Sequence, residues 1–172
     1  MDTQFHMPRW NQLPTVDLYL DQVVTLINST LSPFIFSNIN NNQTENQILT
    51  KTMINNYVKN KLIEAPNKKK YSKVQLAKLI VICVLKQVYS MTDIQILIDI
   101  ALNNSNIEEA YTSFCNQFEE ALQCTYTNKE FTIIVDSNHD KNLLKSVLFS
   151  CTYKIYAQTI INENKNGAIK AL

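Results

Sequence analysis

Glycine is nearly absent from this sequence of 172 residues, which holds a single one, Gly167. Phosphate-cradling loops and dinucleotide-binding turns need several glycines, because a missing side chain lets backbone N–H groups approach the ligand. Type I′ hairpin turns likewise favour Gly or Asn-Gly, and the sequence offers neither before its C-terminal region. These absences argue against nucleotide-binding enzymes of those classes and against a β-sandwich or β-barrel.

Histidine is almost as scarce, with only His6 and His139. His139-Asp140 resembles one part of a metal phosphohydrolase site, but such a site needs further His ligands. The sequence has no Cys-x-x-Cys pair, and its widely spaced cysteines predict buried thiols rather than a disulfide or a metal site. They are Cys83, Cys115, Cys124 and Cys151. We therefore expect no enzymatic activity and no bound metal or cofactor.

Long apolar runs are missing too. The longest run is Leu79–Leu85, which is far shorter than the ~20 residues that span a bilayer. The first residues also lack the apolar segment of a signal peptide. We expect a cytoplasmic protein that does not associate with membranes.

Charge is unevenly placed, although the net charge is only +1. Residues 51–80 hold eight lysines and one acid, a net charge of +7, while residues 1–50 and 81–172 each carry a net charge of −3. A basic block of this kind attracts phosphate backbones. A lysine-rich surface that only meets solvent has the same composition, so charge alone does not decide between the two.

Apolar residues recur with helical spacing along most of the chain, which predicts a mainly α fold. The expected helices cover residues 15–31, 50–62, 72–88, 90–103, 105–124 and 140–164. Residues 131–135 fit either a short strand or the start of a helix. We expect Thr50 to cap one helix, and capping boxes to form between Ser72 and Gln75 and between Ser105 and Glu108.

Residues 50–71 combine a two-faced helix with a basic turn. Ile54, Tyr57, Val58 and Leu62 form an apolar face, and the opposite face is polar. That polar face carries Thr52, Asn55, Asn56 and Lys59. The following connector should turn at Pro66-Asn67 and present Lys68, Lys69 and Lys70. Farther along, Tyr111, Phe114 and Phe118 are at helical spacing and suit a core, or alternatively the lining of an effector pocket.

Three segments resemble the MerR family of winged helix-turn-helix regulators. TKTMINNYVKNKLI resembles the second helix of the helix-turn-helix, KKYSKVQLAKL the wing and the helix after it, and SMTDIQILI the helix that closes the domain. The MerR pattern usually has Gly just before the closing Leu-Ile, where this chain has Lys61. Over Phe5 to Lys165 the chain also resembles an uncharacterised bacterial family, domain of unknown function number 1836. MPRWNQLPTVDLYLDQVVTLI, MINNYVKNKLI and KKYSKVQLAKLIVICVLKQV carry that second resemblance.

The resemblance implies a winged helix-turn-helix-like DNA-binding module over residues 15–90. Residues 91–172 would form a C-terminal helical extension for dimerisation or effector binding. The expected partners are double-stranded DNA and a second copy of the chain, and whether a small-molecule effector binds stays open. The residues expected at the DNA are Lys51, Thr52, Asn55, Asn56, Tyr57, Lys59, Lys61, Lys68, Lys69, Lys70 and Tyr71. The alternative is a protein-protein interaction module on a winged-helix scaffold, whose basic face meets an acidic protein.

Overall fold

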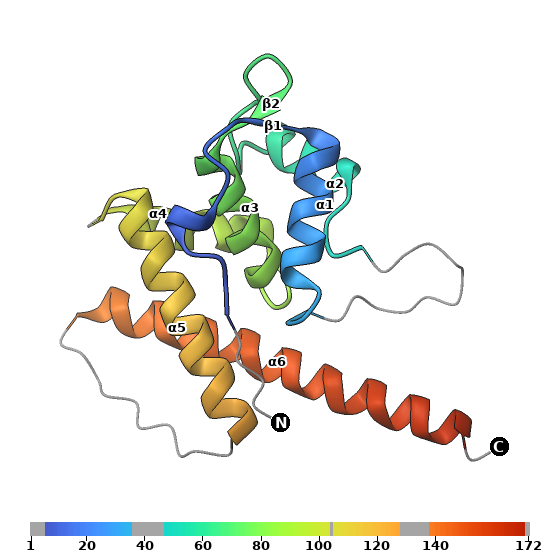
Figure 1. The fold of residues 1–172 in the computed structure, drawn as a ribbon. Helices are drawn as coiled ribbons and strands as arrows, with labels where there is room; N and C mark the ends of the chain where they lie inside the picture. Colours follow the sequence, from blue (N-terminus) through green and yellow to red (C-terminus); the bar gives the residue numbers. More distant parts are fainter. Residues whose placement is uncertain (1–5, 36–46, 104, 128–137, 171–172) are drawn as a thin grey trace.

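The computed structural model describes residues 6–35, 47–103, 105–127 and 138–170, and these are mainly helical (Figure 1). The expected strand or helix at 131–135 lies outside the described residues. Six α-helices, one 3-10 helix and a two-stranded sheet make up the described fold. Their bounds are η1 Trp10–Gln12, β1 Leu18–Tyr19, α1 Leu20–Leu31, α2 Lys51–Lys59, β2 Lys70–Tyr71, α3 Lys73–Leu85, α4 Met91–Asn103, α5 Ile107–Thr127 and α6 His139–Lys170.

Helix α3 lies at the centre, because its sequence is apolar on every side. Nine of its thirteen residues are buried, including the whole stretch Ile82–Leu85. Its start is fixed by the expected capping box: the Ser72 backbone N–H donates to Gln75 Oε1 at 2.8 Å, and the Gln75 N–H donates to Ser72 Oγ at 3.4 Å. Figure 1 shows the other helices arranged around α3.

The two short strands join the start of α1 to the end of the basic turn. β1 and β2 pair antiparallel, with Leu18 opposite Tyr71 and Tyr19 opposite Lys70. Tyr71 is buried, so the pairing also inserts a side chain into the core. The sheet therefore ties the basic turn to the N-terminal end of α1, about fifty residues earlier in the sequence.

The hydrophobic core runs without interruption from the first half of the chain into the second. One cluster contains Ile27 of α1, Ile54 of α2, Phe118 of α5 and Leu148 of α6. Helices α5 and α6 pack against each other, and both also contact α3. The expected division at residue 90 thus falls within a continuous core.

Helix ends differ from the sequence prediction in several places. Helix α1 begins at Leu20 rather than at residue 15, because Leu18 and Tyr19 form β1. Helix α3 ends at Leu85 rather than near residue 88, and α6 continues to Lys170 rather than ending near residue 164. The box predicted at Ser105 and Glu108 is displaced by one residue: the Asn106 N–H donates to Glu109 Oε2, and the Glu109 N–H donates to Asn106 Oδ1. Ser105 instead donates its hydroxyl to the Ala101 carbonyl at 2.7 Å. Helix α2 ends at Lys59 rather than near residue 62, for a reason given below.

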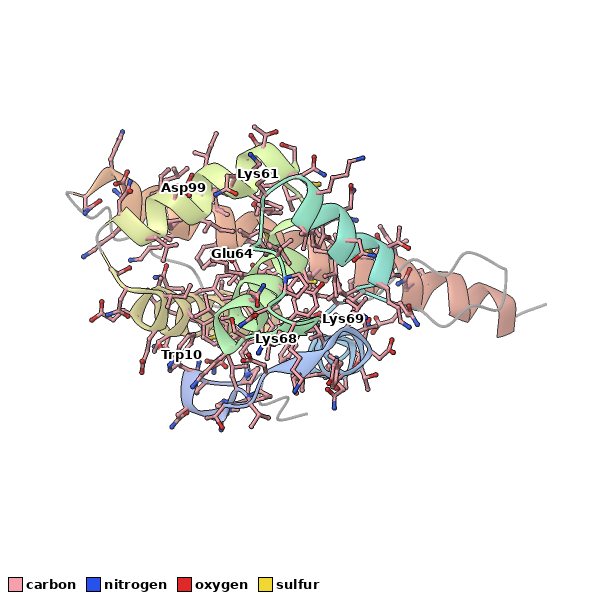
Figure 2. All side chains as sticks on the ribbon, turned by 90° about the horizontal axis from the view of Figure 1, so that it is seen from above. Trp10, Lys61, Glu64, Lys68, Lys69 and Asp99 are labelled. Atoms are coloured by element: carbon pink, nitrogen blue, oxygen red, sulfur yellow. The ribbon has the colours of Figure 1, made fainter. Side chains whose placement is uncertain are left out.

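Helix α6 continues past the rest of the fold. In Figures 1 and 2 its C-terminal half projects beyond the other helices. Within the described residues, no helix combines the length and apolar character needed to cross a membrane.

Candidate nucleic-acid interface

Helix α2 is held in place by one side chain of α1, Asn28. Its Oδ1 accepts from the backbone N–H groups of Ile48 and Leu49 at 2.6 and 3.1 Å. Its Nδ2 donates to the carbonyls of Val24 and Leu49 at 2.8 and 2.7 Å. Three of the four hydrogen bonds of this amide go to the segment that leads into α2, and the fourth returns to α1. Asn28 therefore fixes the position of α2 against α1 across 21 residues of sequence.

A second side chain holds the same segment from α3. Lys86 donates from Nζ to the Ile48 carbonyl at 3.0 Å. Burial lowers the pKa of Lys86, and the nearby Cys83 opposes that shift only in part. Helices α1 and α3 thus both anchor the residues that precede α2. Thr50 then caps α2, with its side-chain oxygen accepting from the Met53 N–H at 3.2 Å.

Helix α2 has the two faces that its sequence predicts. Ile54 and Tyr57 are buried, and Val58 is partly buried against the core. The four polar residues of the opposite face are all exposed: Thr52, Asn55, Asn56 and Lys59. Asn56 is engaged locally, because Asn60 Nδ2 donates to its Oδ1 at 3.1 Å. The polar face is therefore open to a ligand, with Asn55 as its least constrained amide.

Lys61 ends helix α2 in a conformation that usually belongs to glycine. Its φ is 60°, in the left-handed region where a non-Gly residue costs roughly 1–2 kcal/mol. The Lys61 N–H donates to the Val58 carbonyl at 3.0 Å, and the Leu62 N–H donates to the Tyr57 carbonyl at 2.9 Å. This bonding pattern is a Schellman motif, with Leu62 and Tyr57 both buried beneath it. The geometry therefore keeps the glycine-type turn although the sequence has lysine there.

The basic turn is a two-residue hairpin loop built from lysines. Lys68 and Lys69 have φ values of 47° and 66°, the pair of positive angles that a type I′ turn requires. The Lys70 N–H donates to the Asn67 carbonyl at 2.9 Å and closes the loop. The reversal thus lies at Lys68-Lys69, two residues later than the predicted Pro66-Asn67 turn. This type I′ turn forms without glycine, although the scarcity of glycine in the sequence argues against turns of this type.

Lys68 and Lys69 are called the lysine tip from here on. Cation–π contacts hold two lysines that follow the lysine tip in the sequence. Lys70 lies over the Tyr19 ring, with Nζ 4.9 Å from its centroid, and Lys73 lies 4.6 Å from the Trp10 ring centroid. Such cation–π contacts stabilise by ~0.5–1 kcal/mol at exposed sites. Both lysines are consequently partly covered, while the lysine tip is exposed.

Two of the residues predicted at the DNA are buried instead. Tyr57 is 4% exposed and Tyr71 is 3% exposed. Burial also raises the pKa of Tyr57 well above its usual range. Their rings pack in the core and position α2 and β2, so neither is available to touch a phosphate. The sequence alone does not show whether an aromatic residue beside the polar face of a helix is exposed or buried. In α2, Tyr57 belongs to the buried apolar face.

Acidic neighbours divide the lysines of this region into two groups. Lys51 pairs with Asp21, and Lys78 pairs with Glu64 at 2.5 Å. Burial acts to raise the pKa of Glu64, but the hydrogen bond and charge of Lys78 outweigh it and hold that pKa below its usual value. Among the described residues, no ion pair involves Lys59, Lys61 or the lysine tip.

These unpaired lysines and the polar side of α2 are together called the basic face below. It consists of Thr52, Asn55, Asn56, Lys59, Lys61, Lys68 and Lys69. Figure 1 shows the hairpin loop at the end of the molecule opposite α6, with α2 beside it. Figure 2 looks down on that end, with Lys61 and the lysine tip to either side of Glu64. The Glu64 carboxylate is paired with Lys78. This pairing weakens the repulsion that Glu64 would exert on an anion bound at the basic face.

The basic face offers hydrogen-bond donors, amides and cations, and no catalytic grouping. Asn can donate and accept in a bidentate contact with adenine, and Lys supplies cationic donors for phosphate oxygens. Within the described part of the chain, His, Cys, Asp and Glu nowhere gather in threes that could hold a metal ion. Sequence reasoning missed Asn28 and Trp10, because their partners lie far away in the sequence.

A comparison with family models gives a match. The model described as "Domain of unknown function (DUF1836)" matches residues 8–114, which is more than half of the chain. No curated protein and no solved structure matches. The matched segment contains every residue of the basic face, its two anchors Asn28 and Lys86, and the helices α1 to α4. The chain therefore belongs to this family, the domain of unknown function DUF1836.

Proposed function

We propose that the protein is a DNA-binding transcriptional regulator with a MerR-like winged helix-turn-helix. In this assignment α1 and α2 are the helix-turn-helix, the hairpin between residues 60 and 71 is the wing, and α3 and α4 close the module. The observation that carries the proposal is the basic face. An exposed polar helix stands beside a lysine hairpin, and none of its four lysines is in an ion pair within the described residues.

The geometry divides the work between the two parts of the basic face. A helix of the width of α2 fits the major groove, where its amides can read base edges. Asn55 is the residue we assign to base contact, because it is exposed and forms no bond to another described residue of the kind that holds Asn56. Lys59, Lys61 and the lysine tip would bind phosphates and set affinity rather than sequence choice.

The proposal narrows the set of contacts given by the family resemblance. Lys51 keeps a place at the edge, where a phosphate would compete with Asp21 for its ammonium group. An exposed ion pair of this kind contributes only ~0–1 kcal/mol, so exchange for a phosphate is feasible. Lys70 supports the loop from the Tyr19 ring, and Tyr57 and Tyr71 act from the core.

An exposed apolar face of α6 supports the proposal of a homodimer. Tyr153, Ala157, Ile160 and Ile161 are exposed on the projecting half of the helix, and their spacing places them on one face. Tyr153 is 56% exposed and Ile161 46% exposed. We infer that this face meets the same face of a second copy. Two-fold symmetry would then present two basic faces to two half-sites, ~34 Å apart if they lie one DNA turn apart.

Retention on DNA tests the function directly. Fluorescence anisotropy with labelled genomic fragments, at low salt, should show binding by the natural chain. Replacing Asn55 with Ala should weaken the preferred fragment by ~1–3 kcal/mol relative to unrelated DNA. A chain that is not retained on any duplex, and instead co-purifies with an acidic protein that the lysine tip is needed to hold, would favour the interaction module.

A further inference from the structure

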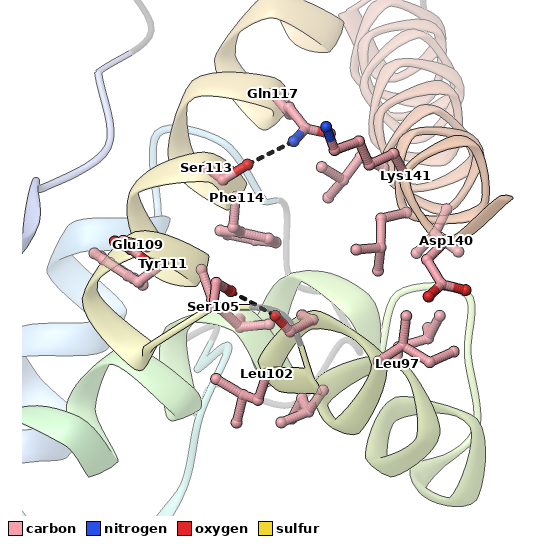
Figure 3. A pocket seen from close by; sticks show the side chains of 18 of the residues that line it. Leu97, Leu102, Ser105, Glu109, Tyr111, Ser113, Phe114, Gln117, Asp140 and Lys141 are labelled. Atoms are coloured by element: carbon pink, nitrogen blue, oxygen red, sulfur yellow. Dashed lines mark hydrogen bonds between the residues drawn. The ribbon is translucent and has the colours of Figure 1, made fainter. Parts of the chain in front are cut away.

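A cavity of about 540 Å³ lies on the side of α3 away from the basic face's helix α2, bounded by α3, α4, α5 and α6 (Figure 3). Its walls are mostly aliphatic, with the rings of Tyr111 and Phe114 on the α5 side. Pockets of ~300–1,000 Å³ with apolar walls and a few polar groups are typical of small-molecule sites. The size and the lining therefore match a site for an organic ligand.

Small side chains keep this space open. Ala77 of α3, Ala101 of α4 and Ala110 of α5 all line the cavity. A larger aliphatic residue at any of the three would fill part of it. Protein interiors normally close-pack, with few spaces larger than a water molecule. Three alanines from three helices around one cavity are thus a feature that a ligand site explains.

One polar group on the wall has an unmet hydrogen bond. Gln117 donates from Nε2 to Ser113 Oγ at 2.7 Å, which fixes the orientation of its amide. The Gln117 Oε1 is buried and has no partner among the described residues. A buried acceptor without a donor costs ~1–3 kcal/mol. Figure 3 shows Gln117 at the cavity, above the Phe114 ring and facing the side chain of Lys141.

The charged residues around the cavity do not favour a strongly charged ligand. They are of both signs, namely Lys78, Glu109, Asp140, Lys141 and Lys145. Lys78 is already paired with Glu64. An apolar wall and a single orphaned acceptor instead suit a neutral molecule.

We propose that this cavity binds a neutral, largely apolar small molecule that carries one hydrogen-bond donor, which Gln117 Oε1 accepts. The site does not depend on DNA binding, since none of its lining residues belongs to the basic face. Helix α3 is capped by Ser72, directly after β2 and the lysine tip. A ligand in the cavity therefore packs against the helix that supports the lysine tip.

Two matched probes test the donor. 2-Naphthol carries a hydroxyl donor, and 2-methoxynaphthalene has the same ring system without it. Isothermal titration of the full chain, with no DNA present, should show one 2-naphthol site per chain. Gln117→Met keeps the side-chain length but removes the acceptor, and should weaken 2-naphthol about tenfold. The affinity of 2-methoxynaphthalene should stay within about twofold. Equal weakening of both probes would overturn the role of the Gln117 acceptor.

A cavity-filling variant tests the location. Ala110→Trp should abolish binding of both probes while circular dichroism and the melting curve show a folded chain. If that variant does not fold, Ala101→Leu is the smaller substitution, and it should weaken both probes at least threefold. The cavity site is wrong if a folded filling variant binds 2-naphthol as tightly as the natural chain. It is equally wrong if the natural chain binds neither probe at ~1 mM.

Discussion

Asn28 and Leu49 are joined through both halves of one amide. The Asn28 Oδ1 accepts the Leu49 N–H at 3.1 Å, and the Asn28 Nδ2 donates to the Leu49 carbonyl at 2.7 Å. Leu49 is fully buried, so these backbone groups have little access to water. One side chain of α1 thereby satisfies the backbone just before α2.

Asn28→Ala should lower the free energy of unfolding by roughly 2–4 kcal/mol, because it leaves several partly buried backbone groups without partners. Denaturant unfolding measures this change. Ser29→Ala, at the exposed neighbouring position, should change it by less than ~0.5 kcal/mol. Asn28→Asp should lie between the two, since it keeps the accepting oxygen but loses the donor. A fully stable Asn28→Ala variant would show that α2 is held mainly by its apolar face.

Lys61→Gly should stabilise the protein, because glycine adopts a φ of 60° without the steric cost that a side chain imposes. The strain relieved is partly offset by the greater freedom of glycine in the unfolded chain, so we expect a net gain of about 0.5–1 kcal/mol. Lys61→Ala removes the same charge without relieving the strain, and should give no gain. Thermal melts of the two variants separate conformation from charge. Equal stability of both would mean that the left-handed turn at this residue is not strained.

Alkaline pH should destabilise the fold through three buried thiols. Burial raises the pKa of Cys83 and Cys151 to about 12 and that of Cys115 to about 11, whereas an unfolded thiol ionises near ~8.5. Above that pH the unfolded state holds fewer protons than the folded state, so stability falls as pH rises. Urea unfolding should give a constant free energy between pH 7 and 8 and a falling one from pH 9 to 10.5.

The control replaces the thiols. Cys83→Ala, Cys115→Ala and Cys151→Ala combined should lower the stability at pH 7 but flatten its decline above pH 9. Cys124 is less buried, so Cys124→Ala should leave the decline unchanged. A triple variant with the same slope as the natural chain would assign the decline to other groups.

Charges on the exposed face of α6 should dissociate the proposed dimer. Tyr153→Glu with Ile160→Glu places like charges on both copies, and light scattering should report a monomer. Glu163→Lys changes the charge of an exposed residue of the same helix by the same magnitude but outside that apolar stripe, and should leave the dimer intact. A natural chain that is monomeric at ~100 μM would contradict the dimer.

Local signals in the sequence predicted the local structure well. Thr50 and the Ser72–Gln75 box are confirmed as caps, because each needs only residues three positions apart. The exposed side of α2 also follows from helical spacing alone. The lysine hairpin was harder, since Lys68 and Lys69 are residues that rarely take positive φ. Pairing of β2 with β1 supplies the support that the local sequence does not.

Long-range packing set the limits of the prediction. Whether Tyr57 and Tyr71 face solvent or core depends on α1 and α3, which spacing within α2 cannot reveal. The bonds of Asn28 span 20 and 21 residues. Four helices form the cavity, so no single segment of the sequence predicts it. Tyr111 and Phe114, which line it, are nevertheless among the residues that the sequence suggested for an effector pocket.

The salt dependence of DNA binding tests the basic face most directly. The test variant combines Lys59→Gln, Lys68→Gln and Lys69→Gln, and its control combines Lys141→Gln, Lys145→Gln and Lys154→Gln on α6, with the same loss of net charge. Each phosphate contact contributes ~0.9 to the slope of log affinity against log salt concentration. We predict that the test variant loses about 2–3 units of slope while the control keeps the natural value. Equal slopes for the natural chain and both variants, or no measurable binding of DNA by the natural chain, would contradict the proposed function.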